Sequence, residues 1–186
     1  MNLQKPISLC FTKESKNKVY FRNASGSYYR LFLIKPPTIT IKGEKVLSTT
    51  LKEKNINVNS KIFVASLSSN LFHWFWVAFS DNYHITSKEF EYFKLELKYL
   101  DNNKKLINLC DSIMEDYEKN SSIRIEQDMR KGLKREVQIF EPRKSKSIID
   151  EIDKVLAEHY GFSDEELDFI INYDIKYRMG RELDSD

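Results

Sequence analysis

The segment VYFRNASGSYYRLFLI, residues 19–34, sets arginines and tyrosines on both sides of a small polar turn. β-Branched and aromatic residues flank the turn, and Gly26 can adopt positive φ without steric cost, so the segment predicts a β-hairpin. Arginine, tyrosine and exposed backbone N–H groups are the groups that bind phosphates and base edges. The hairpin is therefore a candidate DNA contact. The alternative is an ordinary hairpin whose tyrosines, Tyr20, Tyr28 and Tyr29, pack into the core.

More cations and hydroxyl groups follow in the first third of the chain. Protein domains that read DNA use cations to contact phosphates, and Arg, Asn, Ser and Thr on loops that enter a groove. The residues expected to contact DNA are Arg22, Asn23, Ser25, Ser27, Tyr28, Tyr29, Arg30, Lys42, Lys45, Ser48, Thr49 and Thr50. A second basic run, Arg130, Lys131, Lys134 and Arg135, is a candidate for contact with the DNA backbone. Any one of these alone is better explained as a solvated surface charge, and only their clustering favours DNA.

Charge is distributed unevenly along the chain. The net charge of the 186 residues is +2, but residues 1–60 hold 11 Lys and Arg against 3 Asp and Glu, a balance of +8. Residues 150–186 hold 4 against 12, a balance of −8. This asymmetry predicts a basic half that meets an anionic partner. The alternative is that the two ends neutralise each other within the fold.

The sequence lacks the motifs of several enzyme classes. His73, His84 and His159 are far apart and no Cys-x-x-Cys pair occurs, so no metal site is expected. None of the five glycines lies in a phosphate-binding loop, and no G-x-S-x-G nucleophile motif is present. Nucleotide binding, hydrolysis and metal chemistry are therefore not expected of this chain.

Two stretches of β-structure and one apolar helix are expected to position the candidate residues. Residues 38–47, TITIKGEKVL, alternate around Gly43 and predict a second hairpin, and residues 48–59 read as a polar connection. Residues 61–80 are apolar on nearly every side and predict one central core helix, with Ser60 as its cap. His73 lies within this helix and reads as a hydrogen-bonded core histidine.

Helices are expected to dominate the rest of the chain. Residues 101–120 carry apolar side chains at helical spacing, and the segment 131–146 reads as a strand followed by a loop. A helical hairpin then follows, with Ser147 before its first helix, Gly161 after it, and Ser163 and Glu166 as the capping box of the second.

The expected fold is α+β, with N-terminal β-hairpins packed on a buried central helix, then amphipathic helices and a C-terminal helical hairpin. We expect one α+β domain over residues 1–146 and a helical appendage over 147–186. Cys10 and Cys110 read as buried thiols of a reduced protein. Because no long apolar run or secretory signal is seen, a cytoplasmic protein without a membrane span is expected.

Three segments together resemble a known family. Adenine-specific DNA methyltransferases of bacterial restriction–modification systems, especially the combined restriction–methylation enzymes, contain segments similar to three parts of this chain. These parts are the opening hairpin, the segment SLSSNLFHWFWVAFSDNYHIT and the ending KSIIDEIDKVLAEHYGFSDEELDFIINYDIKYRMG. The resemblance spans about residues 18 to 181. It implies a target recognition domain that reads double-stranded DNA, while a separate methyltransferase catalytic domain or subunit modifies adenine with S-adenosylmethionine.

The chain departs from that family in its catalytic motifs. The Asn/Asp-Pro-Pro-Tyr/Phe motif and the glycine-containing S-adenosylmethionine motif are both absent. The segment Lys35-Pro36-Pro37-Thr38 resembles the first of these motifs only superficially. Lysine cannot accept the hydrogen bond of the adenine amino group, and no aromatic residue follows the two prolines. We therefore expect no catalysis, no catalytic residues and no cofactor in this chain. The alternatives are a protein–protein assembly module without DNA contact and, third, an independent enzyme.

Overall fold

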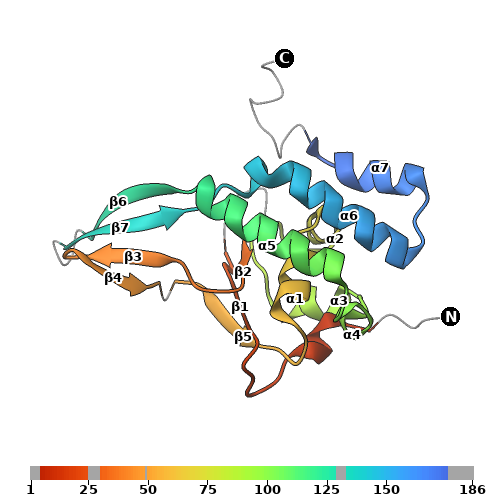
Figure 1. Ribbon diagram of the computed structural model, residues 1–186, viewed down its shortest axis with the longest axis horizontal. Helices are drawn as coiled ribbons and strands as arrows, with labels where there is room; N and C mark the ends of the chain where they lie inside the picture. The colour runs from red at the N-terminus through yellow and green to blue at the C-terminus, as the bar shows by residue number, and fades with distance from the viewer. Residues whose placement is uncertain (1–4, 25–29, 49, 129–132, 176–186) are drawn as a thin grey trace, which may run out of the picture.

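The computed structural model of the protein describes residues 5–24, 30–48, 50–128 and 133–175. Within them, two antiparallel sheets and seven α-helices confirm the expected α+β class. Figure 1 shows the helices gathered at one end and a four-stranded sheet at the other. The strands are β1 (Lys18–Phe21), β2 (Phe32–Leu33), β3 (Thr38–Ile41), β4 (Glu44–Leu47), β5 (Lys52–Asn55), β6 (Ser122–Asp128) and β7 (Leu133–Ile139). The helices are α1 (Ser60–Leu67), α2 (Asn70–Phe79), α3 (Ser87–Tyr92), α4 (Leu97–Leu100), α5 (Lys104–Lys119), α6 (Lys146–Tyr160) and α7 (Asp164–Asn172), with 3₁₀ turns at Ile7–Cys10 and Pro142–Ser145.

The smaller sheet contains the first predicted hairpin. Its strand order is β2-β1-β5, and Tyr20 pairs with Leu33 as the hairpin requires. The expectation of a polar connection after residue 50 was wrong, because β5 pairs antiparallel with β1 along its whole length. Lys52, Glu53 and Lys54 of this edge strand are exposed, so it is held by main-chain pairing and shows no apolar alternation in sequence.

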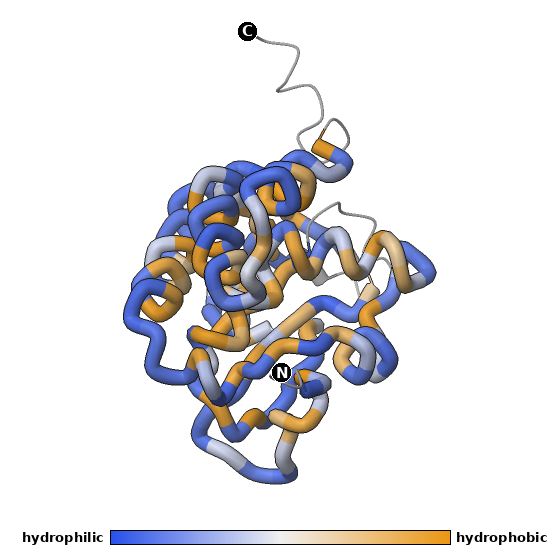
Figure 2. The backbone as a smooth tube through the Cα atoms, turned by 90° about the vertical axis from the view of Figure 1, so that its right-hand side faces the viewer, coloured by the Kyte–Doolittle hydropathy of each residue, from blue (hydrophilic) through white to orange (hydrophobic). Residues whose placement is uncertain are grey.

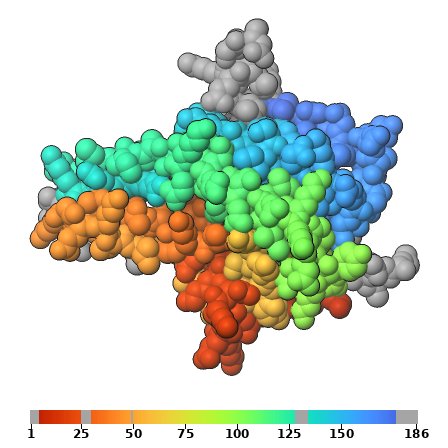
Figure 3. Space-filling model, in the orientation of Figure 1, coloured from red at the N-terminus to blue at the C-terminus, as the bar shows by residue number. Residues whose placement is uncertain are grey.

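The larger sheet has the order β4-β3-β7-β6 and projects from the body as an arm (Figures 1 and 3). Its β3–β4 hairpin confirms the prediction around Gly43. The two turn residues, Lys42 and Gly43, have φ of 53° and 85°, as a type I′ turn requires. Strand β6 was not predicted, while β7 confirms the strand expected before Pro142.

The predicted single helix over residues 61–80 is two helices. Helices α1 and α2 are bent by 60° at Ser68 and Ser69. The break occurs because the Ser69 hydroxyl accepts a hydrogen bond from the Phe72 N–H at 3.1 Å and starts a new helix. The expected cap at Ser60 was also wrong, since the Asn59 side chain accepts the Lys61 N–H instead.

A buried carboxylate from α6 holds the start of α2. Asp153 Oδ2 accepts hydrogen bonds from the Asn70 N–H and Nδ2–H at 2.9 and 2.8 Å, and Oδ1 accepts from the Leu71 N–H at 2.9 Å. Burial raises the pKa of Asp153 to about 7, while these donors act in the opposite direction. The side chain therefore satisfies the free N–H groups of α2 and ties it to α6.

The remaining helices follow the sequence pattern closely. Helix α5 buries Leu106, Cys110, Ile113 and Tyr117 on one face. The tube in Figure 2 alternates between apolar and polar residues along the helices, as amphipathic helices do. Gly161 ends α6 with φ of 73°, and Ser163 and Glu166 form the predicted capping box of α7. Helix α6 begins at Lys146 after Ser145, slightly earlier than the predicted start after Ser147.

One apolar core joins these elements. The buried cluster that contains Phe63 of α1 also contains Ile149, Ile152 and Leu156 of α6. The expected domain boundary between residues 146 and 147 stays a prediction.

Cys10 and Cys110 are free and buried, as expected. Burial raises the pKa of their thiols to about 11 and about 12. No single helix in the described part of the chain has the length and apolar character to cross a membrane; α1 and α2 pass that test only when joined across their bend.

We predict that Asp153→Asn lowers the free energy of unfolding by about 1–3 kcal/mol at about pH 5. At that pH the folded-state carboxyl is protonated but both of its oxygens still accept hydrogen bonds, whereas the asparagine amide has a single accepting oxygen, so at least one buried donor of α2 is left without a partner. Urea unfolding followed by circular dichroism measures the effect.

Glu158→Gln is the matched control, because Glu158 lies exposed on the same helix. The folded-state pKa of Asp153 lies above its unfolded value, so its contribution favours folding below about pH 4 and is lost as the pH rises through about 7. The stability difference between the parent and Asp153→Asn should therefore narrow over that range. An Asp153→Asn variant as stable as the parent throughout contradicts the role given to this carboxylate.

Candidate nucleic-acid interface

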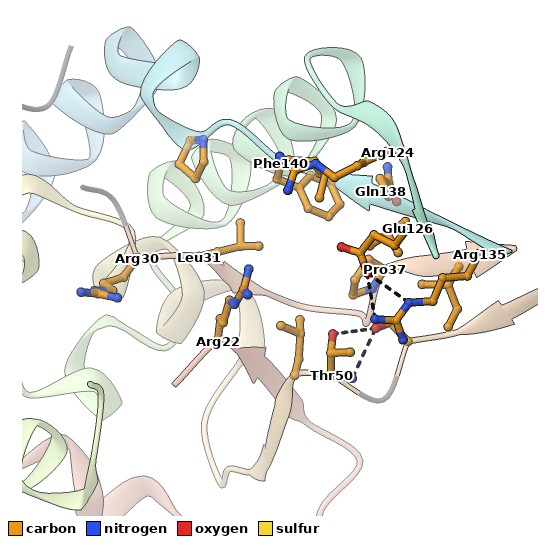
Figure 4. Close-up of a pocket in the computed structure, with 16 residues that line it drawn as sticks. Arg22, Arg30, Leu31, Pro37, Thr50, Arg124, Glu126, Arg135, Gln138 and Phe140 are labelled. Atoms are coloured by element: carbon orange, nitrogen blue, oxygen red, sulfur yellow. Dashed lines mark hydrogen bonds and ion pairs between the residues drawn. The ribbon is translucent and has the colours of Figure 1, made fainter. Parts of the chain in front are cut away.

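A cleft of about 270 Å³ lies between the two sheets, at the root of the arm (Figure 4). One wall comes from the first hairpin and the other from the inner face of the larger sheet. Apolar side chains make up much of the lining, and four arginines belong to it. The lining includes Arg22, Arg30, Leu31, Pro37, Ile39, Ser48, Thr50, Leu51, Arg124, Glu126, Arg135, Val137, Ile139 and Phe140.

The inner wall is built by strand alternation. Arg124 and Glu126 are two residues apart on β6, so their side chains leave the same face of the sheet. Across the ladder, Arg124 pairs with Val137 and Glu126 pairs with Arg135, which places the charged groups among the apolar residues of β7. This wall therefore combines an apolar surface with cations.

One of these cations is already neutralised. Arg135 Nε and Nη2 lie 3.1 and 2.8 Å from Glu126 Oε2. Because Arg135 already has this carboxylate partner, it is less available to an incoming anion than an arginine without one. The pair fixes the side chains at the outer part of the cleft.

Arg22 and Arg124 differ from Arg135. Both are exposed, and within the described residues neither makes a hydrogen bond or an ion pair. They come from the two opposite walls, since Arg22 directly follows β1 and Arg124 lies on β6. An anion that enters the cleft therefore meets two exposed guanidinium groups, and these bind phosphate oxygens through paired N–H donors.

Arg30 occupies a different environment from the one expected. It is 4% exposed, its guanidinium carbon lies 3.5 Å from the centre of the Trp76 ring, and Nη2 donates to the Asn82 carbonyl at 3.4 Å. Burial lowers the pKa of Arg30 to about 10, which leaves it charged at neutral pH. Figure 4 shows its guanidinium pointing away from the middle of the cleft. In this position Arg30 anchors the hairpin to α2, and its expected contact with DNA stays a prediction.

The other expected residues are distributed over several surfaces. Asn23 is half-buried and its carbonyl accepts the Ile85 N–H at 2.7 Å, while Thr50 is exposed at the cleft. Ser48 is buried and its hydroxyl lies 2.8 Å from that of Thr50, so it supports Thr50 and does not itself face solvent. Five expected residues lie outside the described part of the chain: Ser25, Ser27, Tyr28, Tyr29 and Thr49.

The second hairpin contributes its lysines away from the cleft. Lys42 is exposed in the β3–β4 turn. Lys45 pairs with Thr40, and strand alternation places both on the face of the sheet opposite Ile39, which lines the cleft. In the second basic run, Arg130 and Lys131 also lie outside the described residues.

Sequence reasoning missed Arg124. The signal was present in SIRIEQD, residues 122–128, where alternation predicts a strand with Arg124 and Glu126 on one face. The high charge content of the segment hid this pattern. The burial of Arg30 had no comparable signal, because it depends on contact with Trp76.

The described residues hold no group of His, Cys, Asp and Glu side chains that could bind a metal ion. His73 is buried next to Trp76, with ring centres 6.3 Å apart, which confirms a core position. The chemistry that the cleft offers is binding of an anion by arginines. Comparisons with protein-family descriptions, with curated proteins and with solved structures found no match to this chain.

We predict different stability effects for the two hairpin arginines. Arg30→Ala should lower the free energy of unfolding by about 1–3 kcal/mol, because it removes a buried cation–π contact and its packing. Arg22→Ala should change it by less than about 0.5 kcal/mol, since its side chain is exposed. Chemical denaturation of both variants tests the assignment, and equal losses contradict it.

Proposed function

We propose that this chain is a DNA target recognition module of an adenine-specific DNA methyltransferase from a bacterial restriction–modification system. The observation that supports this most directly is the presence of exposed Arg22 and Arg124 on opposite walls of one cleft. The resemblance of residues 18–181 to such enzymes supports the methyltransferase context.

The cleft has the properties of a phosphate-backbone contact. Guanidinium groups bind phosphate oxygens with charge-assisted hydrogen bonds, and an apolar surround such as Ile39 and Val137 strengthens them by reducing solvent screening. Thr50 adds an exposed hydroxyl, which commonly donates to phosphate. Contacts of this kind position a duplex without reading its sequence.

Sequence reading requires a second set of contacts, and the arm is shaped to provide them. The major groove of B-DNA admits a two-stranded β-ribbon, and the β3–β4 turn lies at the far end of the arm (Figure 1). With Lys42 in this turn and Arg22 at the root of the arm, a duplex lying along the cleft meets cations at both ends.

Catalysis belongs to another domain or subunit in this proposal. The two methyltransferase motifs are absent from the sequence, so this chain contributes DNA contacts and its partner contributes S-adenosylmethionine and the adenine pocket. The setting is cytoplasmic, where chromosomal and incoming DNA are both present.

The second candidate is a protein-assembly module without DNA contact. The observation that favours it is an exposed aromatic surface on α2 and α7, which includes Phe79 and Phe169. The salt dependence of DNA binding separates the two, because counterion release accompanies contact with phosphates and not burial of apolar surface.

We predict that the chain binds a labelled mixed-sequence duplex and that affinity falls at least about tenfold between about 50 and 200 mM salt. Fluorescence anisotropy at several salt concentrations gives the affinity and the salt slope. Arg22→Ala and Arg124→Ala should each reduce the slope by about one unit if they contact phosphates.

Lys88→Ala, an exposed substitution on α3, is the control and should leave the slope unchanged. If Arg22 reads a base in the assembled methyltransferase, its loss should cost about 1–3 kcal/mol on the cognate site and relax preference at one position. Salt-independent binding, or unchanged binding in both arginine variants, removes the cleft from the DNA interface.

We also predict that the isolated chain binds no S-adenosylmethionine and transfers no methyl group, because both motifs are missing from the sequence. Isothermal titration calorimetry with the cofactor is the direct measurement. One-to-one binding at micromolar affinity contradicts the division of labour proposed above.

A further inference from the structure

An apolar hollow of about 340 Å³ lies between α2 and α7. Figure 1 shows these two helices in the helical part of the molecule, away from the arm. It is lined by Leu71, Trp74, Phe162, Phe169 and Ile170, with Glu165 and Glu166 at its edge. The Phe169 side chain is 55% exposed, so a large aromatic group faces solvent on one wall. The proposed DNA-binding role makes no use of this surface.

The apolar surface extends beyond the hollow along α2. Trp74 is half-buried and its ring centre lies 6.1 Å from that of Phe79, which is 68% exposed. On the other side, the Phe169 ring centre lies 5.6 Å from that of Tyr173. Exposed aromatic groups that continue into a depression mark interaction sites more often than isolated apolar residues do.

The rim of the hollow is acidic. Helix α7 has the sequence DEELDFIIN, with four carboxylates and no lysine or arginine. Glu166 closes the capping box with Ser163, and part of the acidic character stabilises the N-terminus of α7. Within the described residues, none of the four carboxylates forms an ion pair. The negative charge of these carboxylates is therefore available to attract a positively charged partner.

The backbone around the hollow limits the kind of occupant. Both α2 and α7 satisfy their main-chain groups within the helices and at their caps, so the two walls offer no strand edge to extend. A polypeptide that binds here has to satisfy its own backbone hydrogen bonds, which a helix does. Its apolar side chains fill the hollow, and its flanking charges have to be positive to match the rim.

We infer that the α2–α7 hollow is a docking site for a basic amphipathic helix of a partner protein. Large apolar residues at spacing i, i+4 and i+7 lie against Trp74 and Phe169. Lysine or arginine side chains on the flanks lie against Glu165 and the other carboxylates of α7.

The test uses two fluorescein-labelled synthetic helices of about 18 residues, long enough to form a helix in water. Both carry Leu, Phe and Leu at i, i+4 and i+7; one has lysine at its flanking positions and the other glutamate. Anisotropy with the full chain measures affinity. The lysine peptide should bind at least about tenfold more tightly than the glutamate peptide, and Phe169→Ala should weaken its binding by at least about tenfold.

Tyr92→Ala is the matched control, because Tyr92 is an exposed aromatic residue on α3, and it should leave the affinity unchanged. Glu165→Lys, at an exposed position, should weaken the lysine peptide and strengthen the glutamate peptide. Circular dichroism confirms that each variant is folded. Arg22→Ala should have no effect, which keeps this result independent of DNA binding.

Three outcomes overturn the inference. Equal affinity for the two peptides shows that the acidic rim selects nothing. Binding of the lysine peptide that survives Phe169→Ala places it elsewhere on the acidic surface. If neither peptide binds, while a small apolar dye binds the parent and not Phe169→Ala, the hollow is a small-molecule pocket.

Discussion

The contact between the Asp153 carboxylate and the first N–H groups of α2 is the constraint on which the arrangement of the molecule depends. This buried group accepts three hydrogen bonds from Asn70 and Leu71, so its position on α6 fixes the position of the N-terminus of α2. The bend at Ser69 then turns α2 away from α1, so that α2 packs against α7 and, through Trp76 and Phe72, against Arg30 and Phe32 of the first hairpin. A buried carboxylate costs free energy unless its oxygens are satisfied, and the helix N-terminus satisfies them.

Helix α2 in turn supports the hairpin whose residues are proposed to meet DNA. Trp76 contacts the Arg30 guanidinium on one side and donates its Nε1–H to the His84 carbonyl at 2.8 Å. The loop that contains His84 is also bridged to Ala24 beside the hairpin tip. The hairpin that carries Arg22 is therefore held in place by contacts to Trp76, while the Arg22 side chain itself is exposed. Binding residues held on rigid scaffolds in this way lose little conformational freedom when they engage a ligand.

The sequence predicted those parts of the fold that carry a local signal. Each of these signals lies within about a dozen residues of sequence. They are the helical spacing of apolar residues in α5, the glycine after α6, the capping box of α7 and the alternation around Gly43. The break at Ser69 was missed because an all-apolar run has no polar face to show a change of direction. Strand β5 was missed because its partner lies more than thirty residues earlier and its own side chains are polar. At the cleft, Arg22 was predicted, but Arg124 and the burial of Arg30 depend on strand register and on Trp76, which no short motif encodes.

The two core cysteines give the molecule a pair of native chemical reporters. Cys10 lies in the 3₁₀ turn near the N-terminal end of the described residues, and Cys110 lies on α5 against α1. Their raised pKa values make the reactive thiolate scarce, and their burial keeps alkylating reagents away from the folded state. The rate at which each thiol is modified therefore follows the opening of its own part of the core, which distinguishes local fraying from global unfolding without any added label.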